Sequence, residues 1–157
     1  MTNKINYKVG NILTNVTSGV LLHSVNTLGV MGAGVARGIK SLYPDTFKTY
    51  AAHCNDQFDA SGSALVGTYI FTKENQGKLT IINAFGQTAI GRGGRHVSYD
   101  ALDQIFSDIY SGYLDAVQTI DTVKIGAGLG GGSWPVIEQI LLSRIPDGCT
   151  VNVWDFK

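Results

Sequence analysis

Apolar residues recur along this chain with two periods, and the two patterns predict strands that alternate with helices. Residues 19–25 form a nearly continuous apolar run with β-branched members, which is typical of a strand buried on both faces. Between residues 99 and 117 the apolar positions recur every three or four residues, which predicts a helix with one apolar stripe. The same reasoning predicts strands over 5–9, 19–25, 65–71, 79–84, 122–125 and 150–156, and helices over 34–42, 44–54, 99–117 and 134–145.

The order of these elements predicts an α/β fold. Strands alternate with helices except at residues 74–77, where a polar segment predicts a hairpin. This order favours a mixed sheet with helices on both faces, within a single domain that spans residues 1–157. Ligands of such sheets bind at the carboxyl ends of the strands.

Two glycine-rich loops are predicted at that end of the sheet. One spans residues 26–34 and the other spans residues 126–133, and each follows a strand and precedes a helix. Strand, glycine loop and helix together present backbone N–H groups to an anion. The two loops therefore predict a ligand whose phosphates are held from two sides.

The composition of the chain limits the classes of partner and cofactor that we expect. Twelve Lys and Arg balance twelve Asp and Glu, so the chain lacks the basic excess that a nucleic-acid partner needs. The two cysteines, Cys54 and Cys149, have no metal-ligand spacing, so we expect free thiols, no metal and no cofactor. Lys4 and Asn6 interrupt any apolar leader, and no run reaches about 20 apolar residues. We expect a monomeric cytoplasmic protein without a membrane partner, in the host cytoplasm if its source is viral.

Four motifs carry a resemblance to a known family. They are residues 23–34 (HSVNTLGVMGAG), 83–87 (NAFGQ), 99–102 (YDAL) and 125–134 (IGAGLGGGSW). In order and spacing the chain resembles the macro domain from residue 8 onward. It is most similar to the branch with ADP-ribose 1''-phosphate phosphatases and terminal ADP-ribose protein glycohydrolases. The resemblance implies a three-layer α/β/α fold, with ADP-ribose or ADP-ribose 1''-phosphate as the ligand.

The resemblance also implies which residues bind this ligand. Asn11, followed by Ile12, stands where the family has an acidic residue that meets the adenine amino group, and its amide oxygen can still accept. Trp154 or Phe156 would place an aromatic ring near the adenine, and Phe156 is carried forward as the candidate. The remaining candidates are Asn26, Met31, Gly32, Ala33, Gly34 and Val35 for the distal ribose and part of the diphosphate, and Gly128, Leu129, Gly130, Gly131, Gly132 and Ser133 for the diphosphate.

Three departures from the family bear on catalysis. Residues 83–87 contain no lysine nucleophile, Gly130 replaces a catalytic aspartate, and Ser133 replaces an aspartate found in many relatives. The covalent lysine mechanism is therefore not carried over. Asn26 would orient the ribose and water, and His23 would be the base if its ring faces the ligand; the alternative is that His23 is a core residue. Arg92 would meet a terminal phosphate, or would belong to a solvated loop.

Three functions follow as hypotheses. The first is a metal-independent phosphatase that acts on ADP-ribose 1''-phosphate. The second is an ADP-ribose reader without catalysis, which the scarcity of acid and base groups favours. The third is an ADP-ribosyl hydrolase or deacylase, against which the missing lysine and aspartate count.

Overall fold

The fold is built on one mixed six-stranded sheet. A computed structural model describes residues 4–57, 65–88, 96–112, 118–128 and 130–156. The sheet order is β1-β6-β5-β2-β4-β3, in which β3 alone is antiparallel to its neighbour. The strands are β1 (Ile5–Val9), β2 (Gly19–Asn26), β3 (Tyr69–Glu74), β4 (Leu79–Gln87), β5 (Thr119–Thr122) and β6 (Thr150–Asp155).

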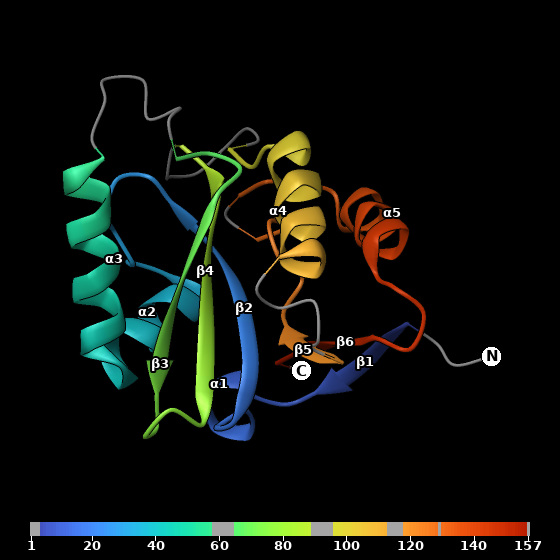
Figure 1. The fold of residues 1–157 in the computed structure, drawn as a ribbon, viewed down its shortest axis with the longest axis horizontal. Coiled ribbons are helices and arrows are strands. Elements are labelled where there is room, and N and C mark those ends of the chain that lie inside the picture. The colour runs from blue at the N-terminus through green and yellow to red at the C-terminus, as the bar shows by residue number, and fades with distance from the viewer. Residues whose placement is uncertain (1–3, 58–64, 89–95, 113–117, 129, 157) are drawn as a thin grey trace.

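Helices cover both faces of this sheet, which confirms the predicted three-layer α/β/α class. Helices α2 (Gly34–Leu42) and α3 (Pro44–Asp56) lie on one side, and α4 (Tyr99–Ser111) and α5 (Trp134–Arg144) lie on the other (Figure 1). The short helix α1 (Ile12–Asn15) connects β1 to β2. No helix in the described part of the chain has the length and apolar character needed to cross a bilayer.

The two core layers follow from the alternation of side chains along the central strands. On β2, Leu21 and Val25 pack with α2 and α3, whereas Val20 and Leu22 pack with α4 and α5. The long predicted apolar run is thus a strand buried on both faces, as expected for the centre of such a sheet.

Three element boundaries differ from the sequence prediction. Strand β5 lies at Thr119–Thr122 instead of 122–125, because Ile120 enters the core and the buried Thr122 hydroxyl donates to the Leu22 carbonyl. Residues 65–68 form a turn, closed by a bond from Thr68 N to Leu65 O, so β3 begins later than expected. Helix α4 ends at Ser111 before Gly112, and residues 113–117 lie outside the described range.

Candidate functional site

A cavity of about 800 Å³ lies across the carboxyl ends of four strands. Its walls come from the ends of β2, β4 and β6, from the residues that follow β5, and from the start of α2. Its size is that of a small-molecule site. The lining residues are His23, Ser24, Val25, Asn26, Val30, Gly32, Ala33, Gly34, Val35, Ala36, Gln87, Val123, Lys124, Ile125, Gly126, Ala127, Gly128, Gly130, Trp154, Asp155 and Phe156.

Asn26 shapes the first glycine loop. Its amide oxygen accepts from Leu28 N at 2.9 Å and lies 2.8 Å from the Tyr50 hydroxyl, while its nitrogen donates to the Val30 carbonyl at 2.8 Å. Tyr50 is fully buried, and burial raises the pKa of its hydroxyl, so it remains a neutral donor. The Asn26 side chain therefore forms its hydrogen bonds mainly within the loop, a role that Asn commonly has in turns.

The first loop leaves the start of α2 open to the cavity. Ala33 occupies the N-cap position and makes no side-chain capping bond, and residues 32–36 all line the cavity. Gly34 has φ of +59°, a left-handed backbone that favours glycine, and a Cβ built there meets nothing within 4 Å. An uncapped N-terminus presents free N–H groups and the positive end of the helix dipole, so this wall can bind an anion.

The second glycine loop is packed much more tightly. A Cβ at Gly130 would lie 2.8 Å from the Gly126 carbonyl oxygen, and one at Gly132 would lie equally close to the same oxygen. Gly132 N donates to Gly126 O at 2.9 Å, and Gly131 N donates to Gly128 O at 3.0 Å. The amides of Gly131 and Gly132, which the sequence predicts to meet a diphosphate, therefore donate inside the loop in this structure.

Helix α5 contributes less to the cavity than its sequence position indicates. Ser133 N donates to the Tyr99 hydroxyl at 2.9 Å, and neither Ser133 nor Trp134 lines the cavity. Trp134 instead donates through its indole to the Tyr7 hydroxyl. Of the second loop, Gly126, Ala127, Gly128 and Gly130 face the ligand space.

His23 lies between the two loops on β2 and is 2% exposed. Its Nε2 is 2.7 Å from the Asn83 amide oxygen, whereas its buried Nδ1 has no hydrogen-bond partner. Burial lowers the pKa of the ring to about 4, because desolvation penalises the cation more than the Asn83 contact stabilises it. The imidazole is therefore neutral at pH 7, with one ring nitrogen uncommitted.

Adjacent residues on β2 do not combine into a nucleophile and base pair. The Ser24 hydroxyl is also buried and without a partner, but successive side chains on a strand point to opposite faces. Ser24 lies toward Gly86 and Leu102 on the α4 side. The described geometry therefore gives no Ser–His dyad at this position.

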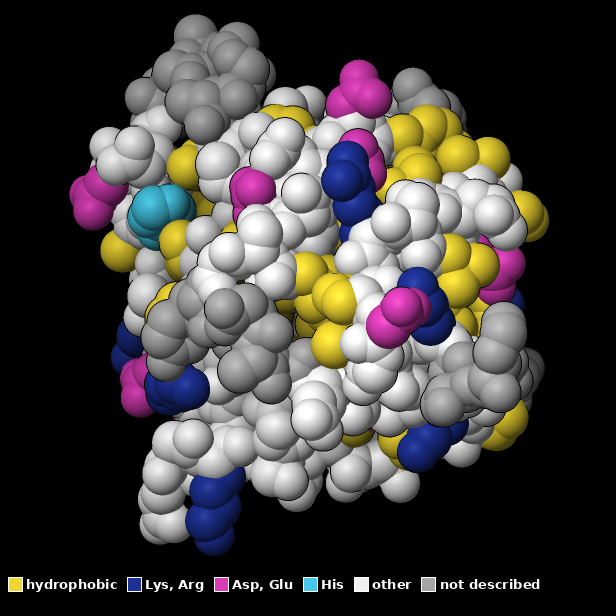
Figure 2. Space-filling view, turned by 45° about the vertical axis from the view of Figure 1, so that its right-hand side comes forward, with side chains coloured by type: hydrophobic (Ala, Val, Ile, Leu, Met, Phe, Trp, Pro, Cys, Tyr) yellow, Lys and Arg dark blue, Asp and Glu magenta, His cyan; other side chains and the backbone are white. Residues whose placement is uncertain are grey.

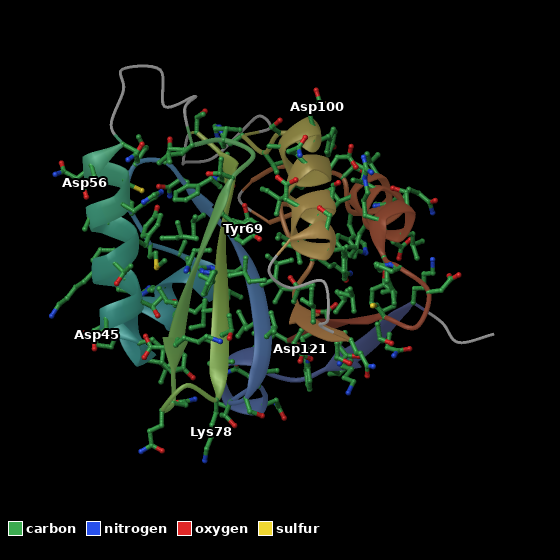
Figure 3. The ribbon with its side chains drawn as sticks, in the orientation of Figure 1. Asp45, Asp56, Tyr69, Lys78, Asp100 and Asp121 are labelled. Atoms are coloured by element: carbon green, nitrogen blue, oxygen red, sulfur yellow. The ribbon has the colours of Figure 1, made fainter. Side chains whose placement is uncertain are left out.

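The β6 end of the cavity is aromatic and charged. Phe156 lines it with 73% of the residue exposed, and Lys124 and Asp155 form an ion pair of 3.6 Å beside it. Trp154 is held from below by a bond of 2.8 Å from its indole to Asp121 of β5, which Figure 3 labels. An exposed ring next to polar groups of both signs suits a planar heterocycle.

The structure places the predicted site residues in three groups. His23, Asn26, Gly32, Ala33, Gly34, Val35, Gly128, Gly130 and Phe156 line the cavity. Asn11, Ile12, Met31, Gly131, Gly132 and Ser133 do not line it. Asn11 caps α1 by accepting from Leu13 N, and Ile12 and Met31 are buried in the core. Arg92 and Leu129 lie outside the described residues.

Sequence reasoning missed several polar residues of the cavity, among them Gln87, Lys124 and Asp155. Each follows or ends a strand, at the position where the predicted ligand end of the sheet lies. That positional rule could have identified them. In the described part of the chain, no group of three or more His, Cys, Asp or Glu side chains is placed to hold a metal ion.

Comparison with known proteins decides the family. The family model described as "Macro domain" matches residues 22–141. The chain belongs to the macro domain family. This macro domain is 26% identical to a protein of Meyerozyma guilliermondii named ADP-ribose 1''-phosphate phosphatase, over 88% of this chain and 92% of the relative.

A second relative points to a different reaction. The chain is 30% identical to a protein of Mycobacterium tuberculosis named DNA ADP-ribosyl glycohydrolase, over 91% of this chain but only 40% of that relative. The solved macrodomain of Mycobacterium tuberculosis DarG has the same fold, with a TM-score of 0.79, 24% identity and coverage of 96% of both chains.

Proposed function

We propose that this macro domain binds ADP-ribose and removes the terminal phosphate of ADP-ribose 1''-phosphate. The observation that carries the proposal is one cavity that combines an uncapped helix N-terminus with a neutral, partly unpaired imidazole. This chain also aligns with 92% of the length of the relative that is named as this phosphatase. Phe156 would contact the adenine, and the loops at residues 26–34 and 126–130 would enclose the phosphates.

The reaction needs a water, a base and stabilisation of charge on the phosphoryl group. The Nδ1 atom of His23 is buried in the free protein, so substrate binding would first have to open it to the attacking water. It would then accept a proton from that water as the new P–O bond forms and the bond to the 1''-oxygen breaks. The leaving 1''-oxygen would take a proton from solvent. Backbone N–H groups of residues 34–36 would stabilise the negative oxygens. Because an anion beside the ring favours its cationic form, substrate binding would raise the pKa of His23 toward neutrality.

In this proposal Asn26 supports the cavity wall and does not act on the reacting atoms. Its amide holds the loop on which the cavity wall depends. The ligand contacts expected of Met31, Ser133 and Arg92 are not required by this arrangement. Arg92 stays a proposed phosphate contact from a segment outside the described residues.

An assay of phosphate release tests the function. Purified protein in EDTA should release inorganic phosphate from ADP-ribose 1''-phosphate, and His23→Gln should reduce kcat by roughly 10²-fold or more if the ring is the base. No release above a buffer blank at high protein concentration contradicts the phosphatase. Calorimetry with ADP-ribose, measured on the same preparation, reports binding independently.

A reader without catalysis is the second candidate, and one observation favours it. The low pKa of His23 makes it a weak base in the free protein. Tight ADP-ribose binding without phosphate release would support the reader. Acidic and basic side chains are interspersed over the face drawn in Figure 2, which gives little support to a nucleic-acid substrate of the glycohydrolase kind. We further propose that residues 1–157 act as one monomeric, cytoplasmic unit.

A further inference from the structure

A chain of polar side chains, in which Thr72 and Glu74 are half-buried and the other members are buried, extends from beside the cavity into the core beneath α3. Its members are His23, Asn83, Thr72, Thr46 and Glu74. Asn83 and Thr46 are fully buried, and the surrounding side chains on this face of the sheet are apolar. A polar chain in such a place is costly unless its members satisfy one another.

The far end of the chain fixes the direction of its hydrogen bonds. Glu74 carries a carboxylate, which only accepts when ionised, so the Thr46 hydroxyl donates to it. The Thr46 oxygen, 2.8 Å from the Thr72 oxygen, is then left to accept from the Thr72 hydroxyl. Thr72 in turn has lone pairs that face the Asn83 amide nitrogen at 3.5 Å.

Backbone atoms fix the orientation of the Asn83 amide independently. Its nitrogen lies 3.4 Å from the Ile81 carbonyl oxygen and 3.5 Å from the Ile70 carbonyl oxygen, and carbonyls accept only. The opposite orientation would place three oxygen acceptors against an oxygen. The Asn83 oxygen therefore faces His23 at 2.7 Å, and an acceptor at that distance requires a proton on Nε2.

We propose that Asn83 is a positioning residue that holds His23 as the Nε2–H tautomer and so leaves Nδ1 as the unprotonated, buried ring nitrogen. Every hydrogen bond in the chain then points from His23 toward Glu74. The proposal rests on the proposed function only for its effect on turnover. The tautomer itself is a property of the free protein.

Nuclear magnetic resonance of ¹⁵N-labelled protein tests the tautomer directly. Protonated and unprotonated ring nitrogens have well-separated ¹⁵N shifts, and couplings to the ring C–H protons identify each one. At pH 7 the wild-type His23 should show a protonated Nε2 and an unprotonated Nδ1. Asn83→Asp, which keeps an oxygen acceptor, should keep Nε2 protonated, whereas Asn83→Leu, which removes it, should move the proton at least partly to Nδ1.

A matched control separates this role from loss of a buried polar contact. Thr80 lies on the same strand, is 5% exposed, and accepts from Lys73 on the other face of the sheet. Thr80→Val should leave the His23 spectrum and the kinetics unchanged. In the phosphatase assay, Asn83→Leu should lower kcat by roughly tenfold or more with little change in KM, since correct protonation of a base is a kcat effect.

A wild-type His23 with its proton on Nδ1, or an unchanged tautomer in folded Asn83→Leu, overturns the proposal whatever the enzyme assay shows. If the protein releases no phosphate, the proposed function fails, and the spectra alone still decide whether Asn83 sets the tautomer. If Asn83→Leu does not fold, the wild-type and Asn83→Asp spectra give the answer.

Discussion

The two glycine loops share a sequence pattern but differ in what their glycines do. In the first loop, Gly34 has open space where a Cβ would be and starts a helix whose N–H groups face the cavity. In the second loop, Gly130 and Gly132 have the Gly126 carbonyl oxygen 2.8 Å from a Cβ position, so glycine is needed for the loop to fold on itself. The first loop therefore leaves open space at the start of α2, whereas the second loop packs against its own backbone.

The hydrogen bonds that hold the two loops in place also differ. Side chains tie the first loop: Asn26 bonds to residues 28 and 30, and the Tyr50 hydroxyl donates to Asn26. The second loop is tied by backbone: Gly130 O accepts from both His96 N and Val97 N, at 2.7 and 3.0 Å. A glycine-rich motif by itself therefore does not tell which of its amides remain free for a ligand.

The largest expected effect is a charge placed in the open loop. Gly32 lines the cavity, and its Cβ position meets only Val30 Cγ1 at 3.5 Å, an ordinary contact. Gly32→Glu should abolish measurable ADP-ribose binding, because its carboxylate would compete for the start of α2, while the thermal melt stays cooperative. Gly32→Gln, of equal bulk without charge, should lose less affinity. Calorimetry measures both, and near-normal affinity in folded Gly32→Glu would falsify the anion site at this loop.

The next prediction concerns the loss of stability at low pH that results from His23, on the strand that leads into the first loop. Since the folded pKa of His23 is about 4 and its ordinary value is 6.5, the unfolded chain binds the extra proton between these values. The stability that the neutral ring contributes is full above pH 6.5 and is lost as the pH falls toward 4, by about 3 kcal/mol at most. Urea unfolding at pH 7, 5.5 and 4 should show this loss in wild type and a shallower one in His23→Gln. Parallel curves for the two proteins contradict it.

A third prediction compares Asn26, which begins the first loop, with Ser133, which ends the second. Asn26→Ala removes the 2.8 Å donor to the Val30 carbonyl and the side-chain acceptor of Leu28 N, and should lower the free energy of unfolding by about 2 kcal/mol, with weaker ADP-ribose binding. Ser133→Ala should change either quantity by less than about 0.5 kcal/mol, because Ser133 makes no capping bond through its side chain. Equal effects in the two variants would remove the distinction between the loops.

The smallest expected effect lies within the closed loop. Gly130→Ala should destabilise the protein by about 1–2 kcal/mol, since its Cβ meets backbone at 2.8 Å. Gly128→Ala, where nothing lies within 4 Å of the Cβ position, should be nearly neutral for stability. Denaturant melts compare the pair. A neutral Gly130→Ala would show that the loop is looser than the contacts indicate.

The sequence predicted the fold well because its strongest signals are physical requirements of buried strands and amphipathic helices. The apolar run of β2 and the stripe of α4 had few other ways to bury their side chains. The position of β5 was wrong by three residues because its residues are a mixture of Thr, Ile and Asp without clear alternation. Its placement is set by tertiary contacts, such as that of Thr122 with the Leu22 carbonyl, which no local pattern contains.

The site was predictable in location but only partly in detail. Motif positions indicated both loops, and Asn26 and His23 line the cavity, while their roles toward a ligand stay predictions. Which backbone amides remain free depends on the folded path of each loop, so the bonds of Gly131 and Gly132 could not be read from glycine content. Asn83 carried no sequence signal as a partner of His23, since the pair is 60 residues apart and meets only through the register of β2 and β4.

The place of β6 in the sheet sets the order in which the site can form during synthesis. Strand β6 inserts between β1 and β5, so β1, the first strand of this sheet in the sequence, pairs with the last one. The same strand and the residue after it supply Trp154, Asp155 and Phe156 to the cavity. A nascent chain that has only reached α5 thus has both glycine loops but neither the wall at this end nor a partner for β1. Ligand binding should therefore appear abruptly when β6 and Phe156 have left the ribosome, and not gradually as the loops emerge.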